Sequence, residues 1–466
     1  MSKNWTPILN RTAGPLYLAL ADAIVEGILD GTLRPGARLP ARRDLAYRLQ
    51  VSINTVSNAY LEAERRGYVL GQVGSGTYVQ APKADSDIRA WHLGGRPAGL
   101  IDLSMCRDCR LPTDEVLFRS AFEQLADDYD HAVSAASRPI IGLDRHRIAG
   151  MSWLETLSVK TPLERTIVTN GNSHALLVVL SALAEPGDLV VTEALTNNAV
   201  ISLASMLHFQ LSGLAIDDEG IVPEALEEAC KNAPAKVLVT TPNYNNPTCC
   251  LMSEERRIRI AEIARRYNIA IVENDPYGPL IENRPPALTA LAPELGHYMT
   301  TLSKSAACMR TGYLAVPESS LARVTARLRI SSWMATTLIA EIAARWIHDG
   351  KLETLVAAHR EELRARQMIL SRVLKDHDVR NFPTGQLAWL NLPEPWRANN
   401  YVAEARLKNI AVTPADPFVV GQGSGPQSIR LSVSIVEDHA TLEAALIYLR
   451  DLLRRTSEPA LAVEHI

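Results

Sequence analysis

The first eighty residues alternate apolar and polar positions with the periods of three helices and a hairpin. Apolar residues recur at helical spacing from Pro15 to Asp30, and Gly31 is a stop signal. A short second helix is predicted from about Arg42 to Leu49, and Ser52 is a good N-cap for a third helix that runs to Arg66. Two β-prone runs around Gly-Ser-Gly follow. This order predicts a winged helix-turn-helix domain over residues 1–80, whose third helix suits a DNA major groove.

The pattern changes twice beyond this point. Residues 81–100 have no periodicity and contain Pro, Gly and Asp, so we predict a linker there. From residue 101 to residue 466, β-prone runs such as "TIVTNG", "KVLVTTP" and "IAIVEND" alternate with helical runs such as "SEERRIRIAEIARRYN". Alternation of this kind predicts an α/β fold with a mostly parallel sheet. The final "RTSEPALAVEHI" is expected to be a loose tail.

Composition and charge narrow the class of protein. Hydrophobic residues make up 47% of the chain and charged residues 21%, as in an ordinary globular protein. No apolar run approaches the ~20 residues of a membrane span, and the N-terminus lacks a secretory signal, so we expect a cytoplasmic protein. The net charge is −4. Residues 1–80 contain nine Lys and Arg against six Asp and Glu, which gives +3 and leaves −7 for the remainder. This asymmetry agrees with a nucleic-acid-binding head on an acidic body.

The cysteines do not indicate a metal site or a disulfide framework. There are six in the chain. Cys106 and Cys109 form a C-x-x-C motif, but no second pair follows at the spacing of a zinc site. We interpret them as reduced loop thiols and predict no metal.

The head resembles the GntR-type winged helix. The shared motifs are Pro-Leu-Tyr, Gly-x-Leu-x-x-Gly-x-x-Leu-Pro, Arg-x-Leu-Ala, Thr-Val-x-x-Ala-Tyr and the Gly-Ser-Gly-Thr wing. The resemblance implies that Arg43 binds a phosphate or a base and that Gly76 lies at the wing tip. It also implies that four side chains of the third helix face the groove: Ser52, Asn54, Thr55 and Ser57. Hydroxyl and amide groups at a helix N-terminus can make such contacts. The alternative is that Ser52 only caps the helix and Thr55 only packs.

The body contains the elements of a pyridoxal phosphate site in five separate segments. Such a site needs a lysine for a Schiff base, donors around a phosphate, and a carboxylate at the pyridine nitrogen if the ring is to accept electrons. "TTLSKSAACMRTGY" places Lys304 among small polar residues, six positions before Arg310. "TNGNSHAL" places Gly171 at a strand-to-helix junction, where free amides can bind phosphate. The other three segments are "TPNYNNPT", "IVENDPYG" and "SIRLSVS".

From about residue 100 to residue 455 the chain resembles the fold type I aminotransferases, and with its head it resembles the MocR-type regulators. The resemblance implies that Lys304 forms the Schiff base and that Asn246 and Tyr277 bond the phenolic oxygen of pyridoxal phosphate. Arg430 would bind the carboxylate of an effector. A homodimer is also implied. The residues assigned to the phosphate are Gly171, Asn172, Ser173, Thr301, Ser303 and Arg310.

Four departures from the family pattern concern the cofactor ring and its surroundings. Asn274 occupies the place of the acid at the pyridine nitrogen, and Asp275, which we include among the cofactor-binding residues, is one place off. Asn197 replaces the stacking aromatic, Cys249 replaces a turn glycine, and the "SAACM" loop before Arg310 is short. We therefore expect attachment and phosphate binding to be retained, while the electron sink and the ring stack are weakened.

These observations favour a DNA-binding transcriptional regulator whose body binds pyridoxal phosphate, an amine or amino-acid effector, or both, with little or no turnover. The effector would act by favouring one arrangement of the heads. One alternative is an active pyridoxal-phosphate-dependent aminotransferase. Another is a regulator whose body has lost the cofactor.

Overall fold

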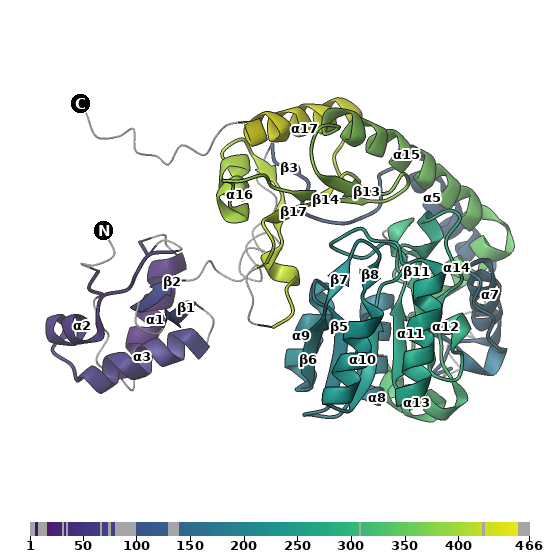
Figure 1. Ribbon diagram of the computed structural model, residues 1–466. Helices are drawn as coiled ribbons and strands as arrows, with labels where there is room; N and C mark the ends of the chain where they lie inside the picture. Colours follow the sequence, from purple (N-terminus) through teal and green to yellow (C-terminus); the bar gives the residue numbers. More distant parts are fainter. Residues whose placement is uncertain are drawn as a thin grey trace. The chain divides into compact units, whose positions relative to one another are not determined.

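The chain forms two compact units, Met1–Ala98 and Gly99–Ile466, which we describe separately. Figure 1 shows the computed structural model. It describes residues 5–7, 16–29, 32–33, 36–65, 68–72, 76–79, 99–128, 139–306, 309–421 and 425–454. The predicted stop at Gly31, nearly all of the predicted linker and the C-terminal tail from residue 455 lie outside these ranges.

The N-terminal unit has the elements that its sequence pattern predicts. Its helices are α1 (Leu16–Leu29), α2 (Arg42–Leu49) and α3 (Ile53–Arg65), and β1 (Val69–Gln72) pairs antiparallel with β2 (Gly76–Val79). Ser52 caps α3, because its Oγ accepts a hydrogen bond of 3.0 Å from the Thr55 amide. The helices and the hairpin share one apolar core, which includes Leu20, Ile24, Leu45, Val56 and Val69.

A seven-stranded sheet forms the centre of the body. Its order is β4 (Thr166–Thr169), β12 (Gly312–Ala315), β11 (Gly296–Thr301), β10 (Ala270–Asn274), β9 (Ala235–Thr240), β5 (Leu189–Glu193) and β6 (Gln210–Leu214). β12 is antiparallel to both of its neighbours, and the other pairings are parallel. This confirms the predicted α/β class with a mostly parallel sheet. The strands lack polar alternation because helices cover both faces of the sheet (Figure 1).

Separate helix layers bury the two faces of this sheet. One apolar cluster contains side chains of α8 (Asn172–Leu183), α9 (Asn198–Leu207) and α13 (Glu318–Ser332). The other contains side chains of α10 (Pro223–Asn232), α11 (Glu254–Tyr267) and α12 (Leu288–Leu291). Ser253 is the N-cap of α11, and its hydroxyl accepts from the amide of Arg256. The predicted helical run "SEERRIRIAEIARRYN" therefore forms a helix that begins directly after its first residue.

A smaller sheet lies towards the C-terminus. Its order is β13 (Val379–Asn381), β14 (Leu387–Asn391), β17 (Ser428–Ser432) and β16 (Thr413–Pro414). Helices α15 (Lys351–Val373), α16 (Ala398–Arg406) and α17 (His439–Arg454) contribute to the core beside it. The start of the body is joined to this region, because β3 (Ile101–Asp102) pairs in parallel with β15 (Ile410–Ala411). Within the described ranges, no helix has both the length and the apolar character that crossing a membrane requires.

Other helices in the described part of the body are α5 (Pro112–Asp128), α7 (Asp144–Thr156) and α14 (Thr337–His348). A buried carboxylate joins the last two. Glu341 of α14 accepts a hydrogen bond of 2.6 Å from Arg145, lies 2.8 Å from His146 Nε2, and accepts a bond of 3.0 Å from Arg345. Burial by itself would raise the pKa of Glu341, but the bonds from His146, Arg145 and Arg345 outweigh burial and lower the pKa to about 2.

This cluster predicts a specific loss of stability in acid. The folded-state pKa of Glu341 is depressed, so its contribution is fully present above its ordinary pKa and is lost as the pH falls towards about 2. In Glu341→Gln, the free energy of unfolding should therefore depend less on pH than in the wild type. The difference should be on the order of 2 kcal/mol between about pH 5 and pH 2, measured by denaturant titration. The same substitution at the exposed Glu262 is the control. Parallel pH profiles for wild type and Glu341→Gln would contradict the assignment.

Candidate functional site

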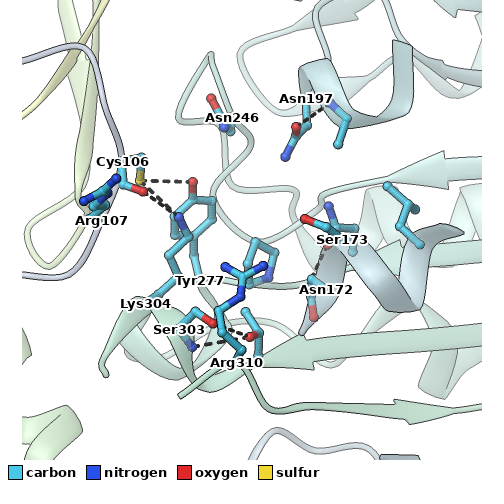
Figure 2. A pocket seen from close by; sticks show the side chains of 15 residues that line it. Cys106, Arg107, Asn172, Ser173, Asn197, Asn246, Tyr277, Ser303, Lys304 and Arg310 are labelled. Atoms are coloured by element: carbon cyan, nitrogen blue, oxygen red, sulfur yellow. Dashed lines mark hydrogen bonds between the residues drawn. The ribbon is translucent and has the colours of Figure 1, made fainter. Parts of the chain in front are cut away.

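A cavity of about 380 Å³ opens where strands β10 and β11 end beside the N-terminus of α8. Figure 2 shows side chains from distant parts of the sequence pointing into it. Most of the residues predicted for the site line this cavity: Asn172, Ser173, Asn246, Asn274, Tyr277, Thr301, Ser303, Lys304 and Arg310. Other lining residues include Cys106, Arg107, Leu176, Asn197, Ala199 and Pro276.

One end of the cavity is a cradle for an anion. Gly171 precedes α8 with φ +82°, and a Cβ there would lie 3.6 Å from Thr301 Oγ1 and 3.8 Å from Arg310 Nη2. The Thr301 and Ser303 hydroxyls are 3.0 Å apart. The free amides at the start of α8 and its dipole favour negative charge at this point. Arg310 reaches the cradle although the preceding loop is short; residues 307 and 308 of that loop lie outside the described ranges.

The polarity of Asn274 follows from its neighbours. Asn172 Nδ2 donates to Asn274 Oδ1 at 2.8 Å and lies 3.5 Å from the main-chain oxygen of Met299. Because a main-chain oxygen can only accept, the Met299 oxygen orients the Asn172 side chain so that its nitrogen, and not its oxygen, faces Asn274. Asn274 must therefore present its oxygen to Asn172. Its own amide nitrogen is left for the cavity, which at this point offers a donor and not a carboxylate.

Asp275 does not line the cavity, contrary to the expectation that grouped it with the cofactor-binding residues. It follows the last residue of β10, and successive residues of an extended chain point to opposite sides. Its Oδ2 accepts hydrogen bonds from Tyr298 (2.6 Å) and Asn243 (2.9 Å). Burial raises the pKa of Asp275, and these two bonds oppose that rise. The fully buried Arg257 donates to Asn243 Oδ1 at 2.6 Å, which leaves the amide of Asn243 to Asp275.

Lys304 extends into the cavity and is held by a segment that sequence reasoning did not associate with it. Its Nζ donates to the main-chain oxygen of Cys106 at 2.9 Å and lies 3.5 Å from Cys106 Sγ (Figure 2). It also lies 5.2 Å from the centre of the Tyr277 ring. Gln386 donates to the main-chain oxygen of Lys304 at 2.8 Å. The C-x-x-C motif that contains Cys106 does not indicate a contact with Lys304, and no motif marks Arg107 or Gln386, because these residues meet Lys304 at the cavity only through the tertiary fold.

The two cysteines of the C-x-x-C motif occupy different surroundings. Cys106 faces the cavity, with its Sγ 3.3 Å from the Tyr277 hydroxyl. Cys109 is buried in the core of the smaller sheet. Both are free thiols, as the sequence predicts.

Tyr277 and Asn246 lie at the other end of the cavity, and Arg430 lies beside it. Burial raises the pKa of Tyr277 well above its usual value, so its hydroxyl stays protonated and can donate. Arg430 does not line the cavity itself. It donates to Asn246 Oδ1 at 2.9 Å and to the main-chain oxygen of Ser104, and it packs 4.8 Å over the ring of Phe418. Its Nε has no partner within the described residues.

Two departures from the family pattern keep local structural roles. Asn197 lines the cavity and is the N-cap of α9, because its side chain accepts from the Ala199 amide at 2.9 Å. It offers no aromatic face. Cys249 is buried with φ +59°, a conformation that favours glycine. The turn therefore retains the positive-φ conformation that a glycine would adopt, although a cysteine occupies the position.

The head presents several of its predicted DNA-binding residues to solvent. Arg43, Ser52 and Asn54 are exposed, while Thr55 and Ser57 are half-buried. The Ser52 and Thr55 hydroxyls are 2.8 Å apart, which supports a capping role for Ser52. Gly76 has φ +119°, and a Cβ there would lie 2.6 Å from Arg38 Nε. Sequence reasoning missed Arg38, a cation held against the wing.

These two units define a class of protein: a DNA-binding winged-helix regulator joined to a body with the fold of an aminotransferase. The GntR family of bacterial regulatory proteins matches residues 16–79, and the family Aminotransferase class I and II matches residues 110–447. The chain belongs to the class I and II aminotransferase family and carries a GntR-type head.

Relatives and solved structures agree with this assignment. The chain is 30% identical to the HTH-type transcriptional regulator YdeF of Bacillus subtilis, over 97% of each chain. It is 27% identical to the vitamin B6 salvage pathway transcriptional repressor PtsJ of Salmonella typhimurium, over 82% of this chain and 86% of PtsJ. The body shares its fold with an archaeal alanine:glyoxylate aminotransferase, with a TM-score of 0.72 at 23% identity over 85% of this chain and 99% of that one.

The exposed position of Arg43 on α2 generates a prediction for the head. Arg43→Ala should weaken binding to specific and non-specific duplexes severalfold and roughly alike, because a phosphate contact carries little sequence information. The slope of log affinity against log salt should fall by about 1. Fluorescence anisotropy at several salt concentrations measures both quantities. The exposed body arginine Arg323, replaced by Ala, is the control. Unchanged affinity in Arg43→Ala would contradict a phosphate contact.

Proposed function

We propose that this regulator binds pyridoxal phosphate, alone or together with an amine or amino-acid effector, through its aminotransferase-like body and does so with little or no turnover. The observation that carries the proposal is the combination found in one cavity. Lys304 and an anion cradle are retained, while Asn274 presents an amide donor where the family has a carboxylate.

The cavity residues fit the cofactor. Gly171, Ser173, Thr301, Ser303 and Arg310 would hold the phosphate, because amides, hydroxyls and a guanidinium converge within a few ångströms. Tyr277 and Asn246 would form hydrogen bonds with the phenolic oxygen of pyridoxal phosphate. Lys304 is the attachment residue. The main-chain amides of Asn172 and Ser173, at the N-terminus of α8, would also donate to the phosphate.

Asn274 determines what the bound cofactor can do. When bound, pyridoxal phosphate supplies an aromatic ring that accepts electrons, and it does so best with a protonated pyridine nitrogen. The Asn274 amide donates a hydrogen bond, so it matches an unprotonated nitrogen and cannot hold a proton there. Asp275 cannot replace it, because its carboxylate is committed to Tyr298 and Asn243 on the other side. The chain's own groups therefore favour binding over turnover.

The name of one relative supports a ligand of this kind. PtsJ is a repressor of a vitamin B6 salvage pathway, and it covers most of this chain at 27% identity. A carboxylate-bearing effector would be bound through Arg430, whose Nε is unpartnered beside Asn246. The competing function is an active aminotransferase, which the class I and II family match favours and Asn274 disfavours.

We also propose that the protein works as a homodimer on paired DNA half-sites. Winged heads commonly read half-sites related by two-fold symmetry. The body exposes large apolar side chains, including Val116 (67% exposed) and Phe122 (56%) on α5, and Trp333 (46%) and Leu338 (47%) near the start of α14. Apolar exposure of this extent is typical of a surface that another subunit covers.

Covalent attachment at Lys304 is the direct test of cofactor binding. The wild type incubated with pyridoxal phosphate should gain a visible absorption band, and reduction with borohydride should fix the added mass on the peptide that contains Lys304. Lys304→Ala should lose both signals. Lys160→Ala, which replaces an exposed lysine, should keep them. A wild type that stays colourless at saturating pyridoxal phosphate would rule out this form of the proposal.

The role of Asn274 is tested by restoring the family carboxylate. Asn274→Asp should raise transamination between an amino acid and a keto acid at least about tenfold over the wild type, which corresponds to about 1.4 kcal/mol of barrier. The substituted side chain can still accept from Asn172. Asn197→Asp is the matched control, because it adds the same charge elsewhere in the cavity and keeps the cap of α9. Robust turnover by the wild type would favour the active aminotransferase instead.

A further inference from the structure

A buried histidine outside the cavity has no hydrogen-bond partner. His359 lies on α15 and is 0% exposed, and neither of its ring nitrogens is bonded within the described residues. Asp114 Oδ1, in the first turn of α5, is likewise buried and unbonded. Leaving a buried polar group without a partner destabilises the folded state, so such groups are rare without a ligand or an ion.

These unbonded atoms face each other, and a second carboxylate lies beside them. His359 Nε2 is 3.5 Å from Asp114 Oδ1. One carboxylate oxygen of Asp108 joins them, and the three donor atoms lie within 4.8 Å of one another. The other oxygen of Asp114 accepts from the Leu111 amide at 3.0 Å, which orients the carboxylate so that Oδ1 points to His359.

The charges around this cluster leave room for a cation. On the same helix, Arg366 pairs with Glu362 at 2.6 Å, so that pair is neutral. The one ion pair found for Asp114 among the described residues is with His359, which is charged only if protonated. A hydrogen bond between His359 and Asp114 would satisfy one nitrogen and leave the other unpaired. A divalent ion would bind His359 Nε2 and both carboxylates together, and it would supply a partner for the unbonded Asp114 Oδ1.

We propose that His359, Asp114 and Asp108 form a binding site for a divalent transition-metal ion. One imidazole with two carboxylates suits zinc or manganese, whereas calcium and magnesium prefer oxygen ligands throughout. Ligand atoms bound to one tetrahedral ion at about 2.1 Å are about 3.4 Å apart, so donor atoms that lie up to 4.8 Å apart must close by about 1 Å when the ion binds. Water completes the coordination.

Cys109 is not a ligand of this site. The donor atoms that lie within 4.8 Å of one another come from Asp108, Asp114 and His359, and the Sγ of Cys109 is not among them. The site therefore differs from the zinc centre that a C-x-x-C motif would form. Its coordination is predicted to contain only nitrogen and oxygen.

Isothermal titration of the full-length protein, freed of metal with a chelator, tests the site directly. Zn²⁺ should bind with one high-affinity ion per chain, and Co²⁺ should give a visible spectrum without a thiolate charge-transfer band. Asp114→Asn should weaken that binding at least about 100-fold, since loss of even an outer-shell partner costs 10–100-fold. The asparagine can still accept from the Leu111 amide, so this variant should fold. His359→Gln should behave alike, and His348→Gln, at an exposed histidine, should bind as the wild type does.

The outcomes separate this proposal from the function proposed above. Lys304→Ala should bind the ion normally, because the ion site does not use the cavity. Failure of the wild type to bind Zn²⁺ or Mn²⁺ tightly would overturn the proposal and leave a His359–Asp114 hydrogen bond only. Equal affinity of wild type, Asp114→Asn and His359→Gln would also overturn it, because the ion would then bind elsewhere.

Discussion

The site depends on one constraint: neighbouring parallel strands end at the same edge of a sheet. Strands β10 and β11 bring Asn274 and Thr301 to one edge, and α8 starts there because β4 ends close by. Only this convergence allows residues that are a hundred positions apart, such as Asn172 and Asn274, to be hydrogen-bond partners. The same convergence places the N-terminus of α8 and Lys304 in one cavity, as the proposed function requires.

Extended backbone geometry adds a second constraint at this edge. Asn274 and Asp275 are adjacent in sequence, yet one faces the cavity and the other faces Tyr298 and Asn243. A carboxylate displaced by a single residue is therefore chemically distant from the cofactor. The buried Arg257 orients the side-chain amide of Asn243, and the main-chain oxygen of Met299 orients that of Asn172. Because an arginine can only donate and a main-chain oxygen can only accept, these two groups determine which end of each amide donates and which accepts.

The sequence predicted the local features of this molecule well and its long-range contacts poorly. Strands, caps and helices have strong local signals, as α2 and the Ser52 cap of α3 illustrate. Lys304 and Asn274 were recognisable because family motifs surround them. Cys106, Arg107 and Gln386 were not, since their roles arise only when a loop from the start of the body folds against Lys304. Asp275 was misplaced because adjacency in sequence does not show which side of the strand a residue faces.

The segment at the start of the body lines the cavity through Cys106 and Arg107. β3 pairs with β15, two residues later the main-chain oxygen of Ser104 accepts from Arg430, and that of Cys106 accepts from Lys304. Lys304 and Arg430, the residues proposed for attachment and for a carboxylate, are thus both hydrogen-bonded to the main chain between Ser104 and Cys106. A ligand bound to Lys304 Nζ would displace the hydrogen bond from this atom to the main-chain oxygen of Cys106. Binding at Lys304 would thereby release the main chain at Cys106, four residues after β3 ends.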